Sequence, residues 1–201
     1  MAQPLPPKPF ATEAVPHVFG YGSLVNVATH DMQPTRPARL SGWRRIWVHT
    51  MALPVAVLSV HRTEGEIAGM LAPVAGGDWR ALDARESGYA RHPATEALRM
   101  DAGGPLPKEA MVYAVDMTPR HLADKHRPIL LSYLDVVLQG FLRSFGETGV
   151  TQFAATTDGW EAAVLDDRAA PRYPRHQPLT AAERGIVDDL LSGLGCRMIR
   201  G

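Results

Sequence analysis

Residues 18–24 have the composition of an anion-binding turn. The sequence there is Val-Phe-Gly-Tyr-Gly-Ser-Leu, so an apolar run leads into two glycines that flank a tyrosine, with a serine directly after the second. This pattern predicts a buried strand that ends abruptly in a turn of exposed backbone N–H groups. Such a turn can hold an anion.

The chemical partner that we expect for this turn is Glu86, in the run Leu-Asp-Ala-Arg-Glu-Ser-Gly-Tyr-Ala-Arg-His at residues 82–92. Glu86 stands where a helical pattern changes to a strand pattern. In an apolar pocket, desolvation would raise the pKa of its carboxyl group, so that Glu86 could take and return a proton near neutral pH. We expect Tyr89, three residues further on, to orient it. The alternative is a solvated helix-end carboxylate paired with Arg85, Arg91 or Arg99.

Several familiar motifs are absent from the sequence. Val25 stands where the third glycine of a dinucleotide-binding fingerprint would be. Ser23 is not on a nucleophile elbow, because Tyr21 and Val25 occupy the positions two before and two after it, where glycines are required. No His-Glu-x-x-His motif occurs, and the histidines lack metal-ligand spacing. We therefore expect neither a nucleotide, nor serine-hydrolase chemistry, nor a metal.

The composition limits the partners and the location. With 201 residues, of which 45% are hydrophobic, the chain can form one core of ordinary size. Lys plus Arg and Asp plus Glu both count 21, without any block of like charges, which argues against nucleic acid and membranes as main partners. The single cysteine, Cys196, excludes an internal disulfide and is expected to be inert. No signal-peptide pattern or membrane-spanning run occurs, so we expect a cytoplasmic protein of undetermined oligomeric state.

The predicted elements place strands first and helices last. Residues 1–15 read as a flexible proline-rich arm, and residues 16–201 as a single domain. A short helix is expected to end close to Glu86. The Arg-Thr-Glu-Gly run at 62–65 supplies turn chemistry and predicts a hairpin of the strands on either side. Strands are expected at residues 17–20, 39–49, 55–61, 66–73, 89–92 and 111–116.

The C-terminal half carries the strongest helical patterns. Apolar residues fall at three- and four-residue steps over residues 129–145, and Gly146 and Gly149 are expected to end that helix. A last helix should follow the capping box that Thr180 and Glu183 form by their spacing. Strands followed by helices favour an α+β fold with a mixed, mostly antiparallel and curved sheet.

The two motifs together resemble the gamma-glutamylcyclotransferase-like family. The run Phe-Gly-Tyr-Gly-Ser-Leu at 19–24 is close to that of the ChaC-like branch, and about sixty residues later come Leu-Asp-Ala-Arg-Glu at 82–86 and the pair Gly88-Tyr89. The pairing, order and separation of the motifs carry the resemblance, which covers roughly residues 17–116. The helix from Ile129 is then a C-terminal extension.

The resemblance implies a small β-barrel with flanking helices, and an enzyme that releases 5-oxoproline from a small gamma-glutamyl substrate without a cofactor. The α-amino group of such a substrate is tethered to its own γ-carbonyl, so ring closure needs restraint and proton transfer only. Glu86 would be the general acid/base. The leaving amine stays open, because residues 44–60 do not read like the glutathione-specific members. The backbone N–H groups around Tyr21, Gly22, Ser23 and Leu24 would hold the α-carboxylate of the substrate, and Tyr89 and Ser23 would be available to steady the oxyanion.

A second hypothesis is a non-catalytic domain that binds an acidic metabolite or the carboxylate of a partner. Glu86 favours catalysis, because a pure binder of anions would do better without a negative charge in its pocket. Residues 156–178 read as an irregular segment laid over the domain. Trp160, Arg168 and Tyr173 within it would suit a lid over a polar ligand.

Overall fold

The computed structural model describes residues 15–50, 52–103, 105–116 and 127–200. Nearly all of the arm predicted for residues 1–15 lies outside this part of the chain. The strands are β1 (His17–Gly20), β2 (Arg36–His49), β3 (Ala56–Pro73), β4 (Ala90–Pro93), β5 (Leu98–Met100), β6 (Ala110–Ala114), β7 (Ile129–Leu130), β8 (Thr157–Asp158), β9 (Val164–Asp166) and β10 (Met198–Arg200). The α-helices are α1 (Arg80–Arg85), α2 (Leu131–Ala155) and α3 (Ala181–Gly193), and the 3-10 turns are η1 (Ser23–Val25), η2 (Val27–Thr29), η3 (Ala75–Gly77) and η4 (Thr95–Ala97).

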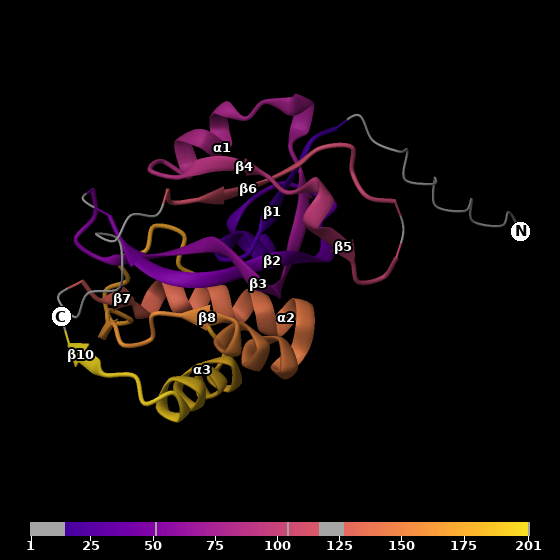
Figure 1. Ribbon diagram of the computed structural model, residues 1–201. Helices are drawn as coiled ribbons and strands as arrows, with labels where there is room; N and C mark the ends of the chain where they lie inside the picture. Colours follow the sequence, from indigo (N-terminus) through magenta and orange to yellow (C-terminus); the bar gives the residue numbers. More distant parts are fainter. Residues whose placement is uncertain (1–14, 51, 104, 117–126, 201) are drawn as a thin grey trace, which may run out of the picture.

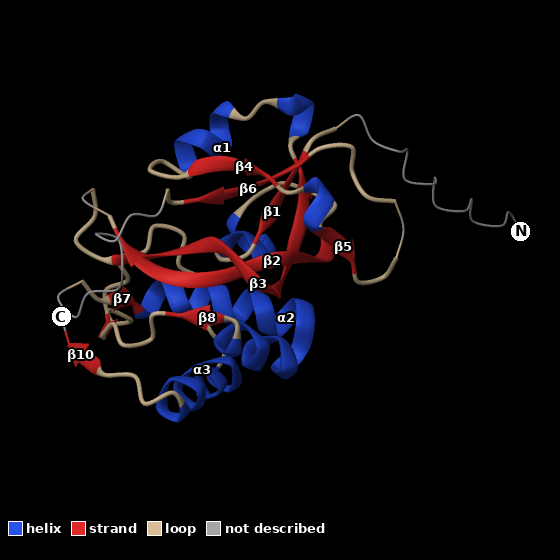
Figure 2. Cartoon of the chain, viewed as in Figure 1, coloured by secondary structure: helices blue, strands red, loops and turns tan. Residues whose placement is uncertain are grey.

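The main sheet has the order β4-β6-β1-β3-β2-β5, with β8 added beside β2. The β1–β6 and β2–β8 pairs are parallel, and the other pairs are antiparallel. The sheet curls so that β2 and β3 pass between α2 and the layer of β1, β4 and β6 (Figures 1 and 2). The predicted α+β fold with a mixed, mostly antiparallel, curved sheet is thus confirmed.

The hairpin predicted around residues 62–65 is wrong. β3 runs through this stretch without turning, because β2 lies beside it from Arg36 to His49 and supplies ladder partners for both halves. The true hairpin joins β2 to β3. The turn-type residues serve instead an irregularity at which the β2–β3 register shifts, between Ser41 and Trp43 on β2.

This irregularity decides which side chains of β2 reach the core. Gly42 sits in it with a φ of 79°, a left-handed conformation that glycine adopts without strain. Before it the buried residues include Leu40, and directly after it the alternate residues Trp43, Arg45 and Trp47 are buried, so the positions that face the core change from even to odd numbers. An arginine is thereby placed inside the core.

Helix α2 extends beyond its predicted end. It begins at Leu131 and continues to Ala155, and Gly146 within it has a non-helical conformation (φ 68°, ψ −169°) that joins two helical segments at a kink. The chain resumes the helix because Val150 and Phe153 bury themselves in the main core there. The glycine therefore bends the helix instead of ending it.

The last part of the chain covers α2 from outside. The capping box of Thr180 and Glu183 is present at the start of α3, which packs on α2 through Val187 and Leu191 (Figure 1). A second sheet of parallel strands, in the order β10-β9-β7, lies beside it. These strands were not predicted, since two or three residues are too few to show a period.

Buried hydrogen bonds connect the segment after β1 with both helices. Asn26 Nδ2 donates to Gln139 Oε1 of α2 at 2.9 Å, and Gln139 Nε2 donates to Glu183 Oε2 of α3 at 3.1 Å. Gly140 allows this close approach, because a Cβ there would lie 2.7 Å from the backbone nitrogen of Asn26. The turn that follows β1 is therefore fixed against α2, and α2 against α3.

Candidate active site

The turn after β1 has open backbone amides. The first hydrogen bond of η1 runs from the Val25 amide to the Gly22 carbonyl, at 2.9 Å. The amides of Gly22 and Leu24, ahead of it, make no hydrogen bond with another described residue. A helical turn always leaves its first N–H groups without an internal acceptor, which makes them available to a ligand.

Gly22 is needed for space. A Cβ at this position would lie 2.7 Å from the Tyr133 hydroxyl oxygen and 3.2 Å from Leu58 Cδ2. The glycine therefore allows Tyr133 of α2 to approach the turn.

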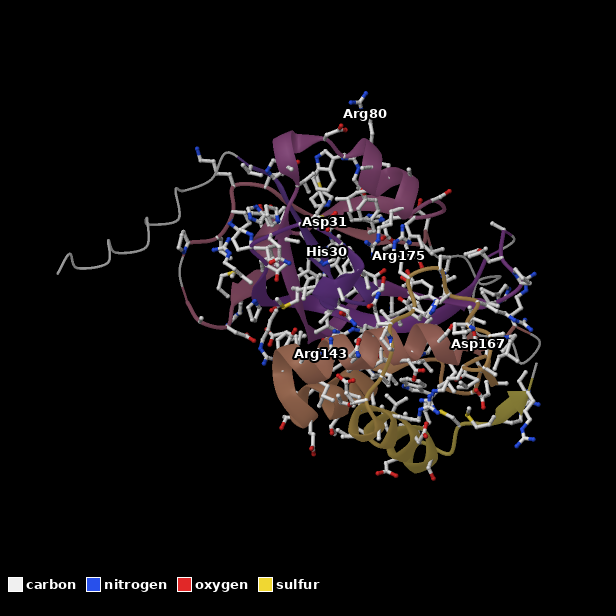
Figure 3. All side chains as sticks on the ribbon, turned by 180° about the vertical axis from the view of Figure 1, so that it is seen from behind. His30, Asp31, Arg80, Arg143, Asp167 and Arg175 are labelled. Atoms are coloured by element: carbon white, nitrogen blue, oxygen red, sulfur yellow. The ribbon has the colours of Figure 1, made fainter. Side chains whose placement is uncertain are left out.

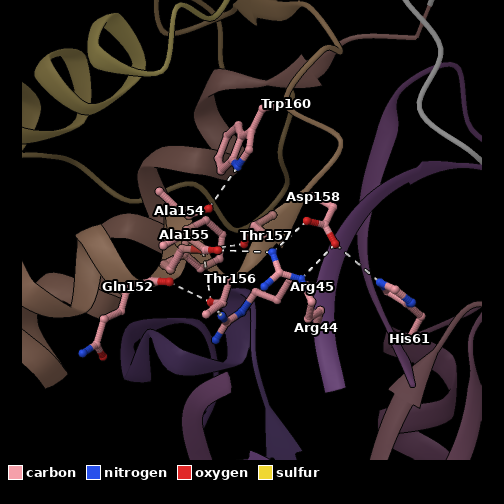
Figure 4. A network of polar contacts seen from close by, with 11 residues as sticks. Arg44, Arg45, His61, Gln152, Ala154, Ala155, Thr156, Thr157, Asp158 and Trp160 are labelled. Carbon is pink, nitrogen blue, oxygen red and sulfur yellow. Dashed lines mark hydrogen bonds and ion pairs between the residues drawn. The ribbon is translucent and has the colours of Figure 1, made fainter. Parts of the chain in front are cut away.

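Arg45 holds the turn from inside the core. It is fully buried, and its Nε donates to the Tyr21 carbonyl at 2.9 Å. Its two terminal nitrogens donate to Thr156 Oγ1, at 2.8 Å, and to the Ala68 carbonyl. Figure 4 shows the Arg45 side chain reaching Thr156. In a trans peptide the C=O and the following N–H point in opposite directions, so this anchor aims the Gly22 amide away from Arg45.

The buried surroundings of Arg45 disfavour its positive charge. Burial lowers the pKa of its guanidinium to about 9. The rings of Phe141 and Phe153, 4.8 and 4.9 Å from the guanidinium carbon, offset part of that cost through cation–π contacts. The protein thus keeps a cation in its core in spite of the desolvation cost, and the hydrogen bond of that cation to the Tyr21 carbonyl holds the turn in place.

A small apolar cluster brings α1 to the turn. Leu24, in η1, packs with Leu82 of α1 and with Val18 of β1. Glu86 is the C-cap of α1, and its amide donates to the Leu82 carbonyl at 2.8 Å. Leu24, which belongs to the turn after β1, thus also sets where the end of α1, and with it Glu86, is located.

Glu86 is enclosed together with Arg85. The exposed fractions of the two side chains are 19% and 10%, and Arg85 Nε lies 3.2 Å from Glu86 Oε1. Arg85 also donates to Ser23 Oγ at 3.3 Å and to the Thr29 carbonyl at 2.9 Å. One arginine therefore ties the carboxylate to the turn. The pairing with Arg85 that the sequence suggested is present, but it is not solvated.

The surroundings shift the pKa of the carboxyl group in the direction that proton transfer requires. Burial raises the pKa of Glu86, and the cations Arg85 and Arg175 oppose the rise. Glu86 Oε2 makes no hydrogen bond with a described residue. One oxygen is thus held by Arg85, while the other remains available to a ligand.

Two adjoining cavities meet at Glu86. An outer cavity of about 390 Å³ lies between the end of α1, β3, α2 and residues 172–175. An inner hollow of about 40 Å³ is formed against the turn at residues 19–24. Both are bordered by Ser23, Leu58, Glu86, Tyr89 and Tyr133. The acid and the open amides thus converge on one site.

All five tyrosines of the chain border these cavities, although they come from different elements: Tyr21, Tyr89, Tyr113, Tyr133 and Tyr173. Burial raises the pKa of Tyr21, Tyr89 and Tyr133 well above the usual value, so these hydroxyls are neutral and can donate hydrogen bonds. Tyr113 and Tyr133 were missed from the sequence, because each stands in an apolar pattern that indicates core.

The hydroxyls of Tyr21 and Tyr89 are both engaged by backbone carbonyls. The Tyr21 side chain points into the core, where its hydroxyl donates to the Tyr113 carbonyl at 2.8 Å, so only its backbone belongs to the turn. The Tyr89 hydroxyl donates to the Leu58 carbonyl at 2.8 Å instead of to Glu86. Arg85, which the sequence suggested only as the partner of a surface carboxylate, orients the acid.

Only part of the predicted lid reaches the cavity. Tyr173 packs edge-on against Tyr133, with ring centroids 4.9 Å apart. Trp160 packs instead against Trp47 in the interior, and Arg168 pairs with Asp135 on the other side of α2. The segment that lines the outer cavity is therefore residues 172–175.

Within the described ranges, no cluster of three or more His, Cys, Asp or Glu side chains has an arrangement that would hold a metal ion. None of the helices in that part of the chain has both the length and the apolar character needed to cross a membrane. Cys196 is half-buried next to α3 and lies outside both cavities at Glu86.

Several solved structures share this fold. One named gamma-glutamyl cyclotransferase matches 87% of this chain and 98% of its own, with a TM-score of 0.55 and 13% identity. The human protein loc79017, described as uncharacterized, matches 88% and 99%, with a TM-score of 0.55 and 14% identity. YkqA from Bacillus subtilis matches 74% of this chain and 57% of its own, with a TM-score of 0.55 and 16% identity. At such identities the likeness shows the fold alone.

Sequence comparison identifies the family. No curated protein matches the sequence significantly. The family described as "Gamma-glutamyl cyclotransferase, AIG2-like" matches residues 18–132, which is more than half of the chain and includes both the turn and Glu86. This chain therefore belongs to the AIG2-like gamma-glutamyl cyclotransferase family.

Proposed function

We propose that this protein is a gamma-glutamyl cyclotransferase, which releases 5-oxoproline and a free amine from a gamma-glutamyl compound, with Glu86 as general acid/base. The observation that carries the proposal is the position of Glu86. It is an enclosed carboxylate with one free oxygen, located where a hollow of open amides meets a larger cavity.

The two cavities suit the two halves of such a substrate. The inner hollow of about 40 Å³ has room for about three water-sized groups, which fits a carboxylate next to the amides of Gly22 and Leu24. With the α-carboxylate held there, the γ-carbonyl group lies near Glu86, and the leaving amine occupies the outer cavity. Cyclisation requires this bent arrangement, and binding both ends supplies it.

The reaction then needs only proton transfer. Glu86 accepts a proton from the α-ammonium group, and the freed nitrogen attacks the γ-carbonyl carbon to close the five-membered ring. The bond from that carbon to the leaving nitrogen breaks as this nitrogen gains the proton from Glu86. The ring nitrogen still carries one proton too many, and Glu86 passes this second proton to the departing amine, which leaves as an ammonium ion while the carboxylate is regenerated. The hydroxyls of Ser23 and Tyr133 border the same space and can donate to the developing oxyanion.

The test is to incubate purified protein with gamma-glutamyl dipeptides, gamma-glutamyl amines and glutathione, and to measure 5-oxoproline. We expect release from at least one substrate, and a fall of about 10²- to 10⁴-fold in kcat for Glu86→Gln. Glu64→Gln, which removes an exposed carboxylate from β3, is the control and should match the wild type.

The non-catalytic hypothesis gives the opposite result. If no substrate yields 5-oxoproline while the folded protein still binds 5-oxoproline or glutamate, the domain is a binder of acidic metabolites. Equal product from the wild type and Glu86→Gln would show that another group carries the proton.

A further inference from the structure

The outer cavity combines an apolar wall with arginine side chains at one side. Leu53, Val55, Val57, Leu130 and Pro174 give the wall its apolar character. The charged side chains that line the cavity are Arg85, Glu86, Arg172 and Arg175. In Figure 3, Arg175 lies between α1, above it, and α2, below it.

The charges in this cavity do not balance. Glu86 is the sole carboxylate among the described lining residues, and it is paired with Arg85. The guanidinium groups of Arg172 and Arg175 make no hydrogen bond or ion pair with any described residue. Two positive charges are therefore left to face whatever occupies the cavity. Arg175 is half-buried and lines the cavity together with Glu86, whereas Arg172 is exposed at the rim.

The segment that carries these arginines is held in place. The Tyr173 amide donates to Ser132 Oγ at 3.2 Å, and the Arg172 amide donates to Asp167 Oδ2 at 2.9 Å. Asp167 is itself buried and accepts a bond from Ser132 Oγ at 2.6 Å. The backbone of residues 172–173 is therefore fixed against the start of α2 before any ligand arrives, which lowers the entropic cost of binding.

We propose that Arg175, assisted by Arg172, binds a carboxylate on the leaving group, so that the preferred substrates are gamma-glutamyl derivatives of α-amino acids and not of simple amines. This inference rests on the proposed function. The amide nitrogen that breaks away lies at Glu86, and in an amino-acid leaving group the carboxylate is two bonds from that nitrogen. An arginine that lines the same cavity as Glu86 can therefore meet such a carboxylate. The apolar wall then receives its side chain.

A matched pair of substrates tests this directly. Gamma-glutamyl-L-alanine and gamma-glutamylethylamide differ only by the carboxylate of the leaving group, and gamma-glutamyl-L-alaninamide replaces that carboxylate with a neutral group of similar size. We expect kcat/KM for 5-oxoproline release to be about 10- to 100-fold higher for the alanine substrate than for either neutral one, the range of a charge-assisted hydrogen bond.

Variants then assign the preference to Arg175. Arg175→Gln should lower kcat/KM for the alanine substrate by about 10-fold or more, chiefly through KM, and leave the ethylamide within about threefold. Arg175→Lys should retain part of the preference, and Arg172→Gln should lose less of it because Arg172 is at the rim. Arg184→Gln, on the exposed side of α3, is the matched control.

The comparison between substrates separates this inference from other effects. Arg175 also lowers the pKa of Glu86, but a changed pKa affects both substrates equally and cancels in their ratio. Release from the ethylamide at a rate equal to the alanine substrate, or equal losses on both in Arg175→Gln, would overturn the carboxylate subsite and leave the cyclotransferase proposal standing. Release from neither substrate nor any other gamma-glutamyl compound would overturn both.

Discussion

Two arginine–carboxylate pairs lie on opposite sides of α2 and differ in what they leave free. Asp135 accepts two hydrogen bonds from Arg168, at 2.7 and 2.8 Å, and Arg168 continues to Asp188 at 2.6 Å. Glu86 receives one longer bond from Arg85 on one oxygen. Burial raises the pKa of both carboxyl groups. A raised pKa and an arginine neighbour therefore do not distinguish a reactive acid, whereas an unbonded oxygen facing a cavity does.

The same contrast predicts opposite consequences for activity and stability. In the first pair, one carboxylate oxygen of Glu86 has no hydrogen bond with a described residue. In the second pair, both carboxylate oxygens of Asp135 accept a hydrogen bond from Arg168. Substitutions in the first pair should therefore damage 5-oxoproline release and spare folding. Substitutions in the second should do the reverse.

The largest effect is expected from Glu86→Gln. We expect a loss of about 10²- to 10⁴-fold in kcat with no fall in Tm at neutral pH. The sign follows from the pKa: since the folded-state pKa of Glu86 is raised, the ionised carboxylate costs folding free energy above that pKa, and a neutral amide removes the cost. Thermal unfolding of the wild type and the variant at pH 7 measures the difference in Tm, and a clear drop in Tm would show that Glu86 has a structural role.

The next effect is expected from Gly22→Ala. The added methyl would lie 2.7 Å from the Tyr133 hydroxyl and would move the turn or α2 by some tenths of an ångström. We expect kcat/KM to fall about 10- to 100-fold, since misplacement of this size is costly to a positioned reaction. Tyr133→Phe removes the hydroxyl that the new methyl would meet. Adding Gly22→Ala to Tyr133→Phe should therefore lower kcat/KM by less than Gly22→Ala does in the wild type. Absence of any recovery would mean that the turn does not need this space.

A smaller effect should follow from Arg85→Gln. Arg85 lowers the pKa of Glu86, so without it that pKa rises further. Because the reaction begins with the ionised carboxylate, the acid limb of the kcat/KM profile should move to higher pH. Above that limb, we expect a fall of about 10-fold, since Ser23 and Thr29 lose their contacts with Arg85. An unmoved limb would mean that Glu86 is not the group that titrates.

The smallest effect on activity is expected from Arg168→Gln, with kcat/KM within about threefold of the wild type. Stability should instead fall by about 2–3 kcal/mol at pH 7, because Asp135 is left as a buried carboxylate without its partner. Arg168 lowers the pKa of Asp135, so the substitution raises that pKa. The loss of stability should therefore shrink as the pH falls below the raised pKa and Asp135 becomes protonated. Denaturant unfolding across pH measures this, and a pH-independent deficit would contradict it.

The parts that could be predicted from the sequence are those with a local signal. The apolar run before Gly20, the periodicity of α2 and the capping box of α3 each depend on neighbouring residues. The strand through residues 62–65 was missed because its turn-type residues are overruled by the pairing with β2, which is a tertiary effect. The kink at Gly146 was missed for a similar reason, since burial of Phe153 continues the helix.

The site was predictable only in part. The turn and Glu86 carry recognisable motifs, whereas Tyr133 stands in the apolar stripe of α2. Which residue of that stripe faces the cavity depends on how α2 is rotated, and contacts with Asn26 and with α3 set this rotation. Arg45 was missed because the irregularity at Gly42 reverses which positions of β2 point inward. Long-range packing decides both the rotation of α2 and the inward position of Arg45, and it cannot be read from a single sequence.

The link from Asn26 through Gln139 to Glu183 has a consequence for protein engineering. A truncated chain ending before Thr180 would keep every motif of the site, yet it would leave the Gln139 amide group without the Glu183 acceptor and uncover the apolar flank of α2. The smallest working version of this scaffold therefore has to include α3, and a fusion partner is best attached beyond that helix.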